Sequence, residues 1–160
     1  FRSVTAPGHL PPPSKRGDVF RQAALKALDT LSRNPDGFFL MIEGSNIDKA
    51  AHSNNLEEMM EELLDFDRTA GAVLDWASKH PGTLVVITAD HNTGAFALTG
   101  GSREKGEITA RFGSGSHDGV AVPVYAFGAG SGAFTGIYEN TAIFSKIMDA
   151  FKKGAGKPVR

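Results

Sequence analysis

The stretch E-G-S-N-I-D-K-A-A-H, residues 43–52, places two carboxylates and an imidazole directly after the apolar run F-F-L-M-I. Each of these groups is costly to bury unless it is paired or bound to a metal ion. Asp48 and His52 are four positions apart, so both side chains would face the same way in a helix or turn. Such a pair suits zinc, and the oxygens of Glu43 would also suit magnesium. An accidental D-x-x-x-H pair and a solvated Glu43 are the alternative interpretation.

A second pair, Asp90 and His91, follows the apolar run T-L-V-V-I-T, and His117 lies in the glycine-rich loop S-G-S-H-D-G. Open α/β sheets bind ligands beyond the carboxyl ends of their strands, where both carboxylate–imidazole groups stand. The chain has no cysteine, so a metal must be held by His, Asp or Glu. Three carboxylates and three imidazoles could hold two or three divalent ions, as phosphoryl transfer uses them. Taken alone, His117 could equally be a solvated loop side chain.

The composition is that of an ordinary globular chain. Its 160 residues are 41% hydrophobic and 22% charged, which is enough for one domain with a core. The net charge of −1 leaves no basic footprint for nucleic acid, so we expect no nucleic acid as a specific partner. No apolar run is long enough to span a bilayer, and we expect no membrane partner. The first residues lack a secretory signal and a Met, which we interpret as processing, cleavage or omission.

The spacing of apolar residues predicts helices alternating with strands. Helices are expected from Asp18, acting as N-cap, to the N-P-D-G turn, from Asn55 to about His80, and from Asn140 to Lys152. The predicted strands are 38–42, 83–88, 95–98, 107–112 and 122–127. We expect the first two of these strands to be buried on both faces.

This order of elements predicts an α/β fold with a mostly parallel sheet covered by helices on both faces. The proline-rich residues 1–17 are expected to form an extended lead-in. Residues 18–153 would form the body of a single domain, and residues 154–160 a tail.

Together these motifs resemble the alkaline phosphatases. The segments that carry the resemblance are G-F-F-L-M-I-E-G-S-N-I-D-K-A-A-H, L-V-V-I-T-A-D-H-N-T-G and G-S-H-D-G-V-A-V-P-V-Y-A-F-G, in this order. The resemblance implies the C-terminal portion of a bacterial-type member, whose assembled form binds two zinc ions and one magnesium ion. It implies that Asp48, His52 and His117 hold the first zinc. Asp90 and His91 would be part of the second zinc site.

The resemblance also implies that Glu43 is a magnesium ligand and that Lys49 contacts phosphate through water. A solvated loop side chain is the alternative for Lys49. The sequence reads H-D-G where members often have H-T-G, which places Asp118 beside a metal ligand. We expect the Asp118 side chain to point to solvent.

The family nucleophile is a serine in a D-S-A context, which does not occur in this sequence. By resemblance it belongs to an N-terminal part, together with further metal ligands and a phosphate-binding arginine. The expected function is hydrolysis of small phosphate monoesters through a phosphoserine intermediate, with this chain inactive alone. A partnership with that N-terminal part, a homodimer and a periplasmic or secreted location are expected by resemblance only.

Two other functions remain open at this point. The chain could be a non-catalytic fragment that binds one zinc, or part of a phosphodiesterase or mutase of the same superfamily. Without partner strands the sheet would expose edges and an apolar face, so we expect the isolated chain to aggregate or fold poorly.

Overall fold

The structure, a computed structural model, describes residues 10–154. The fold belongs to the α/β class, as predicted. The predicted alternation of helices and strands was wrong, because among the described residues helices α1 to α4 come first, strands β1 to β6 follow, and η1 and α5 come after them. The elements are α1 (Pro13–Arg16), α2 (Val19–Leu31), α3 (Ser45–His52), α4 (Leu56–Ser78), β1 (Leu84–Thr88), β2 (Asn92–Thr93), β3 (Ala97–Ser102), β4 (Glu107–Arg111), β5 (His117–Asp118), β6 (Val124–Gly128), the 3₁₀-helix η1 (Ser131–Phe134) and α5 (Ala142–Gly154).

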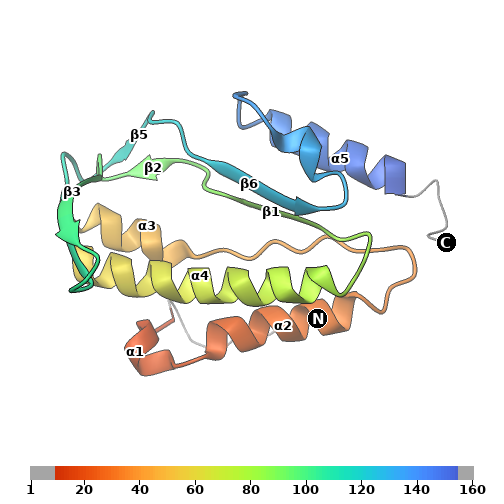
Figure 1. Cartoon of the computed structure of the whole chain (residues 1–160), viewed down its shortest axis with the longest axis horizontal. Helices are drawn as coiled ribbons and strands as arrows, with labels where there is room; N and C mark the ends of the chain where they lie inside the picture. Colours follow the sequence, from red (N-terminus) through yellow and green to blue (C-terminus); the bar gives the residue numbers. More distant parts are fainter. Residues whose placement is uncertain (1–9, 155–160) are drawn as a thin grey trace.

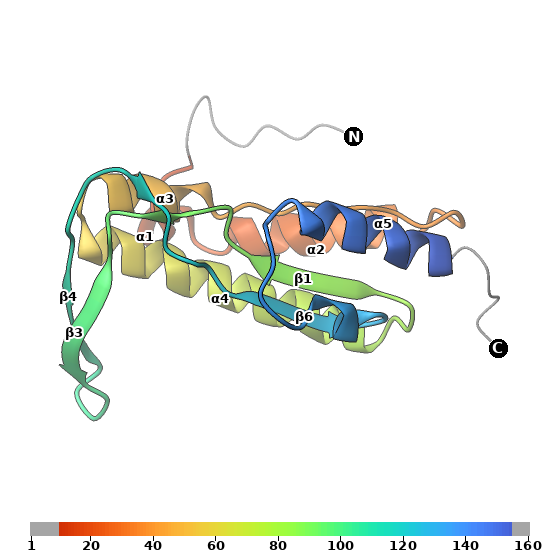
Figure 2. The same ribbon diagram turned by 90° about the horizontal axis from the view of Figure 1, so that it is seen from above.

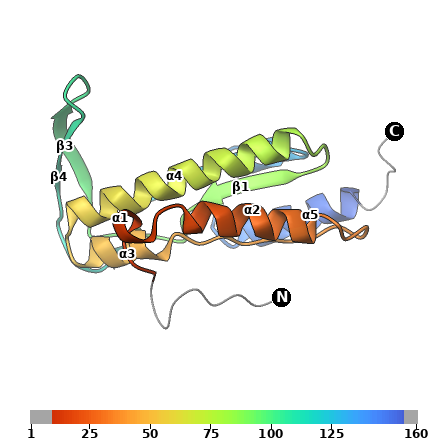
Figure 3. The same ribbon diagram turned by 90° about the horizontal axis from the view of Figure 1, so that it is seen from below.

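The elements are arranged in layers around the long helix α4. Helices α2 and α4 run side by side on one side of the β1–β6 pair, and α5 lies on the other side (Figure 1). Helix α4 packs against α1, α2, α3 and β1. At one end of α4, helix α3 lies near the short strands β2 and β5 (Figure 1). The β3–β4 hairpin extends away from the helices (Figures 2 and 3). The loops that carry the candidate ligands therefore gather at one end of the molecule.

A polar residue precedes each of α2 and α4, but of the two only Asn55 caps its helix through its side chain. Helix α4 begins as predicted: the Asn55 side chain accepts a hydrogen bond from the Glu58 amide at 3.1 Å and donates one to the Glu58 carboxylate at 3.2 Å. Asp18 precedes α2 but does not cap it through its side chain. Its carboxylate instead accepts two hydrogen bonds from Arg21, at 2.6 and 2.7 Å. No helix within residues 10–154 is both long and apolar enough to cross a membrane.

The strand pairs within residues 10–154 are all antiparallel, whereas a mostly parallel sheet was predicted. Strands β1 and β6, which correspond to predicted strands 83–88 and 122–127, form one of these antiparallel pairs. Leu84 of β1 lies opposite Gly128 of β6, and Thr88 lies opposite Val124. The chain leaves the end of β1, makes an excursion through β2 to β5, and re-enters β6 at that same end (Figure 1). A connection that returns to the end from which it left produces an antiparallel pair.

Residues 38–42 are not the buried strand that their apolar run predicted. They form no strand in the described part of the chain. Phe38 packs edge-on against Trp76 of α4, with ring centroids 6.3 Å apart. The alternate side chains face outward, with Phe39 61% and Met41 76% exposed. One face of this segment therefore packs on α4, and the other has no partner among residues 10–154.

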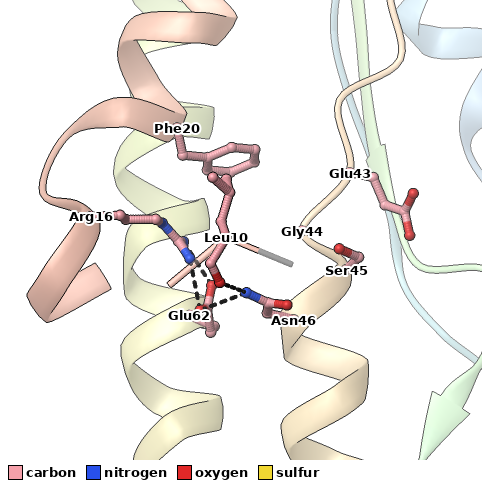
Figure 4. Close-up of a pocket in the computed structure, with 8 residues that line it drawn as sticks. All are labelled: Leu10, Arg16, Phe20, Glu43, Gly44, Ser45, Asn46 and Glu62. Atoms are coloured by element: carbon pink, nitrogen blue, oxygen red, sulfur yellow. Dashed lines mark hydrogen bonds and ion pairs between the residues drawn. The ribbon is translucent and has the colours of Figure 1, made fainter. Parts of the chain in front are cut away.

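Residues 10–17 also differ from the predicted extended lead-in, because they include α1 and a buried arginine. The Arg16 guanidinium donates hydrogen bonds to Glu62 at 2.7 and 2.8 Å and to Asp65 at 2.7 Å. The Asn46 side chain donates to the same Glu62 carboxylate, which joins α1, α3 and α4 (Figure 4). The carboxylates of Glu62 and Asp65 hold this segment in place through Arg16. The proline-rich composition of the segment gives no sign of these ion pairs. Residues 1–9 of the lead-in and 155–160 of the tail lie outside the described residues.

The core is small for a chain of this length. Ala50, Ala51 and Met59 form a buried cluster between α3 and α4. Among the described residues no large side chain is completely buried. Large apolar side chains remain exposed on several elements, including Ile137 at 102% and Phe144 at 70%. A small core together with many exposed large apolar side chains is typical of a folded unit that contacts further protein.

Candidate metal centre

Helix α3 presents Asp48 and His52 on one face. The two residues are four positions apart, and the His52 Nε2 atom lies 3.4 Å from the Asp48 carboxylate. The buried Ala50 and Ala51 pack against α4, so α3 is held close to its neighbour through small side chains. The D-x-x-x-H spacing therefore forms a helical pair, as the sequence indicated.

His117 on β5 completes a three-residue cluster with this pair. Its Nε2 atom lies 3.0 Å from Nε2 of His52 and 3.6 Å from the Asp48 carboxylate. One ligand atom from each of the three residues lies within 4.8 Å of the others. A tetrahedral zinc ion with ligands at about 2.0–2.1 Å separates its ligand atoms by about 3.3 Å. The observed separations match the spacing that a shared zinc ion would require.

A backbone contact fixes the orientation of the His52 ring. Its Nδ1 atom lies 2.7 Å from the Gly115 carbonyl oxygen, which can only accept a hydrogen bond. The proton therefore resides on Nδ1, and the lone pair of Nε2 faces His117 and Asp48. Ligating histidines in proteins are commonly oriented in this way through their second nitrogen.

Thr93 joins the first cluster to the second candidate pair. Its buried hydroxyl donates to the Asp48 carboxylate at 2.6 Å and lies 3.1 Å from Nδ1 of His91. Because the single hydroxyl proton is used toward Asp48, the oxygen accepts from His91, which leaves Nε2 of His91 with a lone pair. Sequence reasoning missed Thr93. Its signal was a hydroxyl two positions after His91 in the D-H-N-T-G motif.

Ring stacking places the second pair beside the first cluster. The His91 and His117 rings stack with centroids 3.6 Å apart and planes 22° apart. Nε2 of His91 lies 3.3 Å from the Asp90 carboxylate, whose side chain is 88% exposed. Asp48 and Asp90 are 42 positions apart in the sequence. Their two carboxylate–imidazole groups nevertheless lie next to each other at one end of the molecule.

Glu43 and Lys49 have different surroundings from this cluster. Among the described residues, the carboxylate and imidazole atoms that converge on a single point do not include those of Glu43. Glu43 precedes α3 and lines a cavity of about 200 Å³ with Arg16, Asn46 and Glu62. Its carboxylate points away from these three side chains (Figure 4). Lys49 is exposed on α3 beside Asp48.

Asp118 does not point to solvent as expected. Its carboxylate accepts hydrogen bonds from the amides of Val120 and Ala95 and from the Asn92 side chain. The Val120 hydrogen bond contributes most to holding the pKa of Asp118 below its ordinary value, and those from Asn92 and Ala95 act in the same direction. The carboxylate is therefore part of the loop structure next to His117.

Replacing the hydroxyl of Thr93 tests its part in the site. Thr93→Val preserves the shape but removes the bonds to Asp48 and His91, so zinc affinity should fall by roughly 10–100-fold, as for loss of outer contacts to ligands. Zinc titration against a competing chelator measures this fall. Thr109→Val is the control, because Thr109 lies on the exposed β3–β4 hairpin. Equal affinities for both variants would exclude an orienting role for Thr93.

Comparisons with known proteins agree on one family. The family model described as alkaline phosphatase matches residues 13–112. Alkaline phosphatase 4 of Bacillus subtilis is 45% identical over 85 residues, covering 53% of this chain and 18% of that protein. Alkaline phosphatase H of Pseudomonas aeruginosa is 31% identical over 156 residues, covering 86% of this chain and 33% of that protein.

A solved structure gives the same result for the fold. A mutant of the alkaline phosphatase from the Antarctic bacterium TAB5, with Mg bound in its M3 site, superimposes with a TM-score of 0.85 at 37% identity. The match covers 93% of this chain and 46% of that one. The chain thus spans about half of the solved structure and a third or less of the two curated relatives. By sequence and by structure, this chain belongs to the alkaline phosphatase family.

Proposed function

We propose that this chain supplies part of the active site of a metal-dependent phosphate monoesterase. The observation that carries the proposal is the convergence of Asp48, His52 and His117, with separations that suit one zinc ion. Zinc at such a site provides Lewis-acid stabilisation of the oxygens around a transferring phosphoryl group. Similarity to alkaline phosphatases supports phosphate monoesters as the substrate class.

In this proposal the chain's own groups hold and orient the ligands. Asp48, His52 and His117 hold the first zinc, and Asp90 with His91 forms part of the second zinc site. The Gly115 carbonyl and the Thr93 hydroxyl keep the Nε2 lone pairs of His52 and His91 available. The stacked rings of His91 and His117 keep the two sites adjacent.

We assign Glu43 to a magnesium site and Lys49 to a water-mediated phosphate contact on the strength of the family resemblance. Glu43 lies two residues before α3, next to its N-cap Gly44, and therefore near the start of the helix that carries Asp48. The Lys49 ammonium is an exposed cation beside Asp48. A cation near the site favours a phosphate dianion. The proposed complement of the assembled enzyme is two zinc ions and one magnesium ion.

The remaining catalytic groups are proposed to lie in a part of the protein outside these 160 residues. A nucleophilic serine there would form the phosphoserine intermediate, since a covalent intermediate divides one difficult step into two. The exposed apolar side chains and the limited coverage of relatives support a missing partner region. Residues 38–42, whose outer face has no partner among residues 10–154, would then join a mostly parallel sheet that includes strands of that region.

Metal analysis combined with an activity assay tests the proposal. The whole natural protein that contains these residues should retain about two zinc ions and hydrolyse p-nitrophenyl phosphate. Mass spectrometry of the same sample identifies any second polypeptide. A whole protein that retains no zinc, or that retains zinc without hydrolysing any phosphate monoester, would overturn the proposal.

The completeness of the first cluster favours a second candidate, a zinc-binding fragment without catalysis. All three ligands and both orienting groups lie in this chain, so one zinc could bind without the rest. This candidate predicts zinc binding but no turnover even with the N-terminal part present. A phosphodiesterase or mutase of the same superfamily would instead prefer a diester or a phosphosugar to p-nitrophenyl phosphate.

Assembly and location complete the proposal. A homodimer and a periplasmic or secreted location are proposed from similarity to bacterial alkaline phosphatases. Light scattering of the whole protein and fractionation of the source cells measure these two properties.

A further inference from the structure

The Asp118 carboxylate lies at the centre of a set of hydrogen bonds that the proposed function does not use. Its Oδ1 accepts from the Val120 amide at 3.1 Å and from the Asn92 side chain at 3.1 Å. Its Oδ2 accepts from the same Asn92 nitrogen at 2.9 Å and from the Ala95 amide at 3.0 Å. Both oxygens are thus engaged, and each binds one backbone amide.

These bonds join the two loops that carry candidate ligands. Asn92 directly follows His91, and Asp118 directly follows His117. The loops also pair through the two-residue strands β2 and β5, in which Asn92 lies opposite Asp118 and Thr93 opposite His117. Backbone hydrogen bonds of Gly94 continue this pairing: its amide donates to the Ser116 carbonyl at 2.9 Å, and its carbonyl accepts from the amides of residues 113 and 114. So short an antiparallel pair is marginal by itself. The bonds between Asn92 and Asp118 add a side-chain connection to this short backbone pairing, directly beside His91 and His117.

The turn held by Asp118 has an unusual backbone. Gly94 and Ala95 both have positive φ, at 80° and 44°. A left-handed alanine is strained and persists only where its surroundings hold it. Its amide is the group that donates to Asp118. Gly94 leaves no room for a side chain, because a Cβ there would lie 2.9 Å from Phe112 and 3.1 Å from the Ala51 carbonyl oxygen.

We infer that Asp118 is a positioning residue, which with Asn92 clamps the His91 loop to the His117 loop and thereby sets the zinc affinity of the site. The inference rests on the proposed function, since it concerns the metal held by Asp48, His52 and His117. The clamp acts on the geometry of the His117 and His91 rings, whose stacking depends on the relative placement of the two loops. A threonine at this position, as in the H-T-G reading, has one short hydroxyl and could not engage all of these donors.

Two substitutions separate the clamp from the charge of the carboxylate. Asp118→Asn keeps the shape of the side chain and removes its charge. It also replaces one acceptor oxygen by an amide NH₂ group, which faces the donors of Asn92, Ala95 or Val120 and cannot accept from them. Asn92→Ala keeps the charge and removes only the two bonds from Asn92. If the bonds position the ligands, both variants should bind zinc roughly tenfold more weakly or worse, the range for lost outer contacts. The double variant should bind zinc almost as tightly as the weaker-binding single variant, because both substitutions break the same connection between Asn92 and Asp118.

The measurement is zinc titration of the whole natural protein against a competing chelator, with the spectrum of the Co²⁺-substituted protein as a second readout. The clamp predicts altered Co²⁺ bands in both variants, because the ligand geometry changes. Asp149→Asn is the matched control: it removes an exposed carboxylate whose one salt bridge among the described residues is with Lys152 on α5, and it should change neither readout. Urea unfolding of the metal-free variants identifies any that fail to fold. If Asp118→Asn does not fold, the zinc affinity and Co²⁺ spectrum of the milder variant Asn92→Ala decide the test.

The outcomes are distinct. Unchanged zinc affinity and Co²⁺ spectrum in both variants would overturn the inference. Weaker binding by Asp118→Asn with normal binding by Asn92→Ala would also overturn it, because charge alone would then explain the effect. An unsubstituted protein that binds no zinc would overturn the proposed function itself, and this inference with it.

Discussion

Replacement of His117 by alanine is expected to abolish tight zinc binding at the three-residue cluster. In the proposed site His117 provides one of three protein ligand atoms, and its Nε2 lies 3.0 Å from that of His52. Loss of an outer contact to a ligand weakens binding by roughly 10–100-fold, so loss of a ligand should exceed roughly 100-fold. Zinc content after dialysis and titration against a chelator measure the loss. Phosphatase activity of the whole protein should fall with the zinc content.

The control for this prediction is His80→Ala. His80 is an imidazole at the end of α4 that stacks on Trp76 at 3.7 Å and bonds its carbonyl oxygen at 2.7 Å. It therefore reports the effect of losing any exposed imidazole. If His117→Ala retained zinc as well as His80→Ala does, the cluster would not be a metal site.

Replacement of Arg16 by methionine is expected to destabilise the protein strongly. The change leaves Glu62 and Asp65, whose side chains are each only 4% exposed, without their buried cation. Breaking a buried ion pair by removing one partner lowers the free energy of unfolding by about 3–5 kcal/mol. Urea unfolding of the whole natural protein at neutral pH measures the change. Adding Glu62→Gln and Asp65→Asn should restore part of the loss, because the buried charges are then removed as well.

Arg33→Met is the matched control for Arg16→Met. Arg33 pairs with Asp29 at 3.0 Å, but both side chains are more than half exposed, at 73% and 54%. Surface pairs of this kind contribute about 0–1 kcal/mol. A loss no larger in Arg16→Met than in Arg33→Met would show that the buried network does not hold α1 against α4.

Much of the local structure follows from the sequence, because it depends on neighbouring residues. The Asn55 cap, the apolar stripe of α4 and the turn after α2 are local, and these elements form where predicted. Asp48 and His52 share a face because helical spacing alone requires it. The absence of cysteine limited any metal site to His, Asp and Glu.

Prediction failed where a residue depends on a distant partner. Arg16 looked like part of an extended lead-in, but its environment is set by Glu62 and Asp65, which lie more than 45 positions away. Residues 38–42 read as a buried strand, yet burial of both faces requires neighbours that residues 10–154 do not provide. Asp118 was expected in solvent because the return of its loop to Asn92 cannot be read from local spacing.

The sequence by itself determined the ligand types, the helical pair of Asp48 and His52, and membership of the alkaline phosphatase family. Only the tertiary structure decided that His117 meets that pair across 65 positions, and that Thr93 bonds Asp48. The physical reason is range. Helical periodicity relates residues within a turn or two, whereas the meeting of separate loops depends on how α3, β2 and β5 pack at the end of α4.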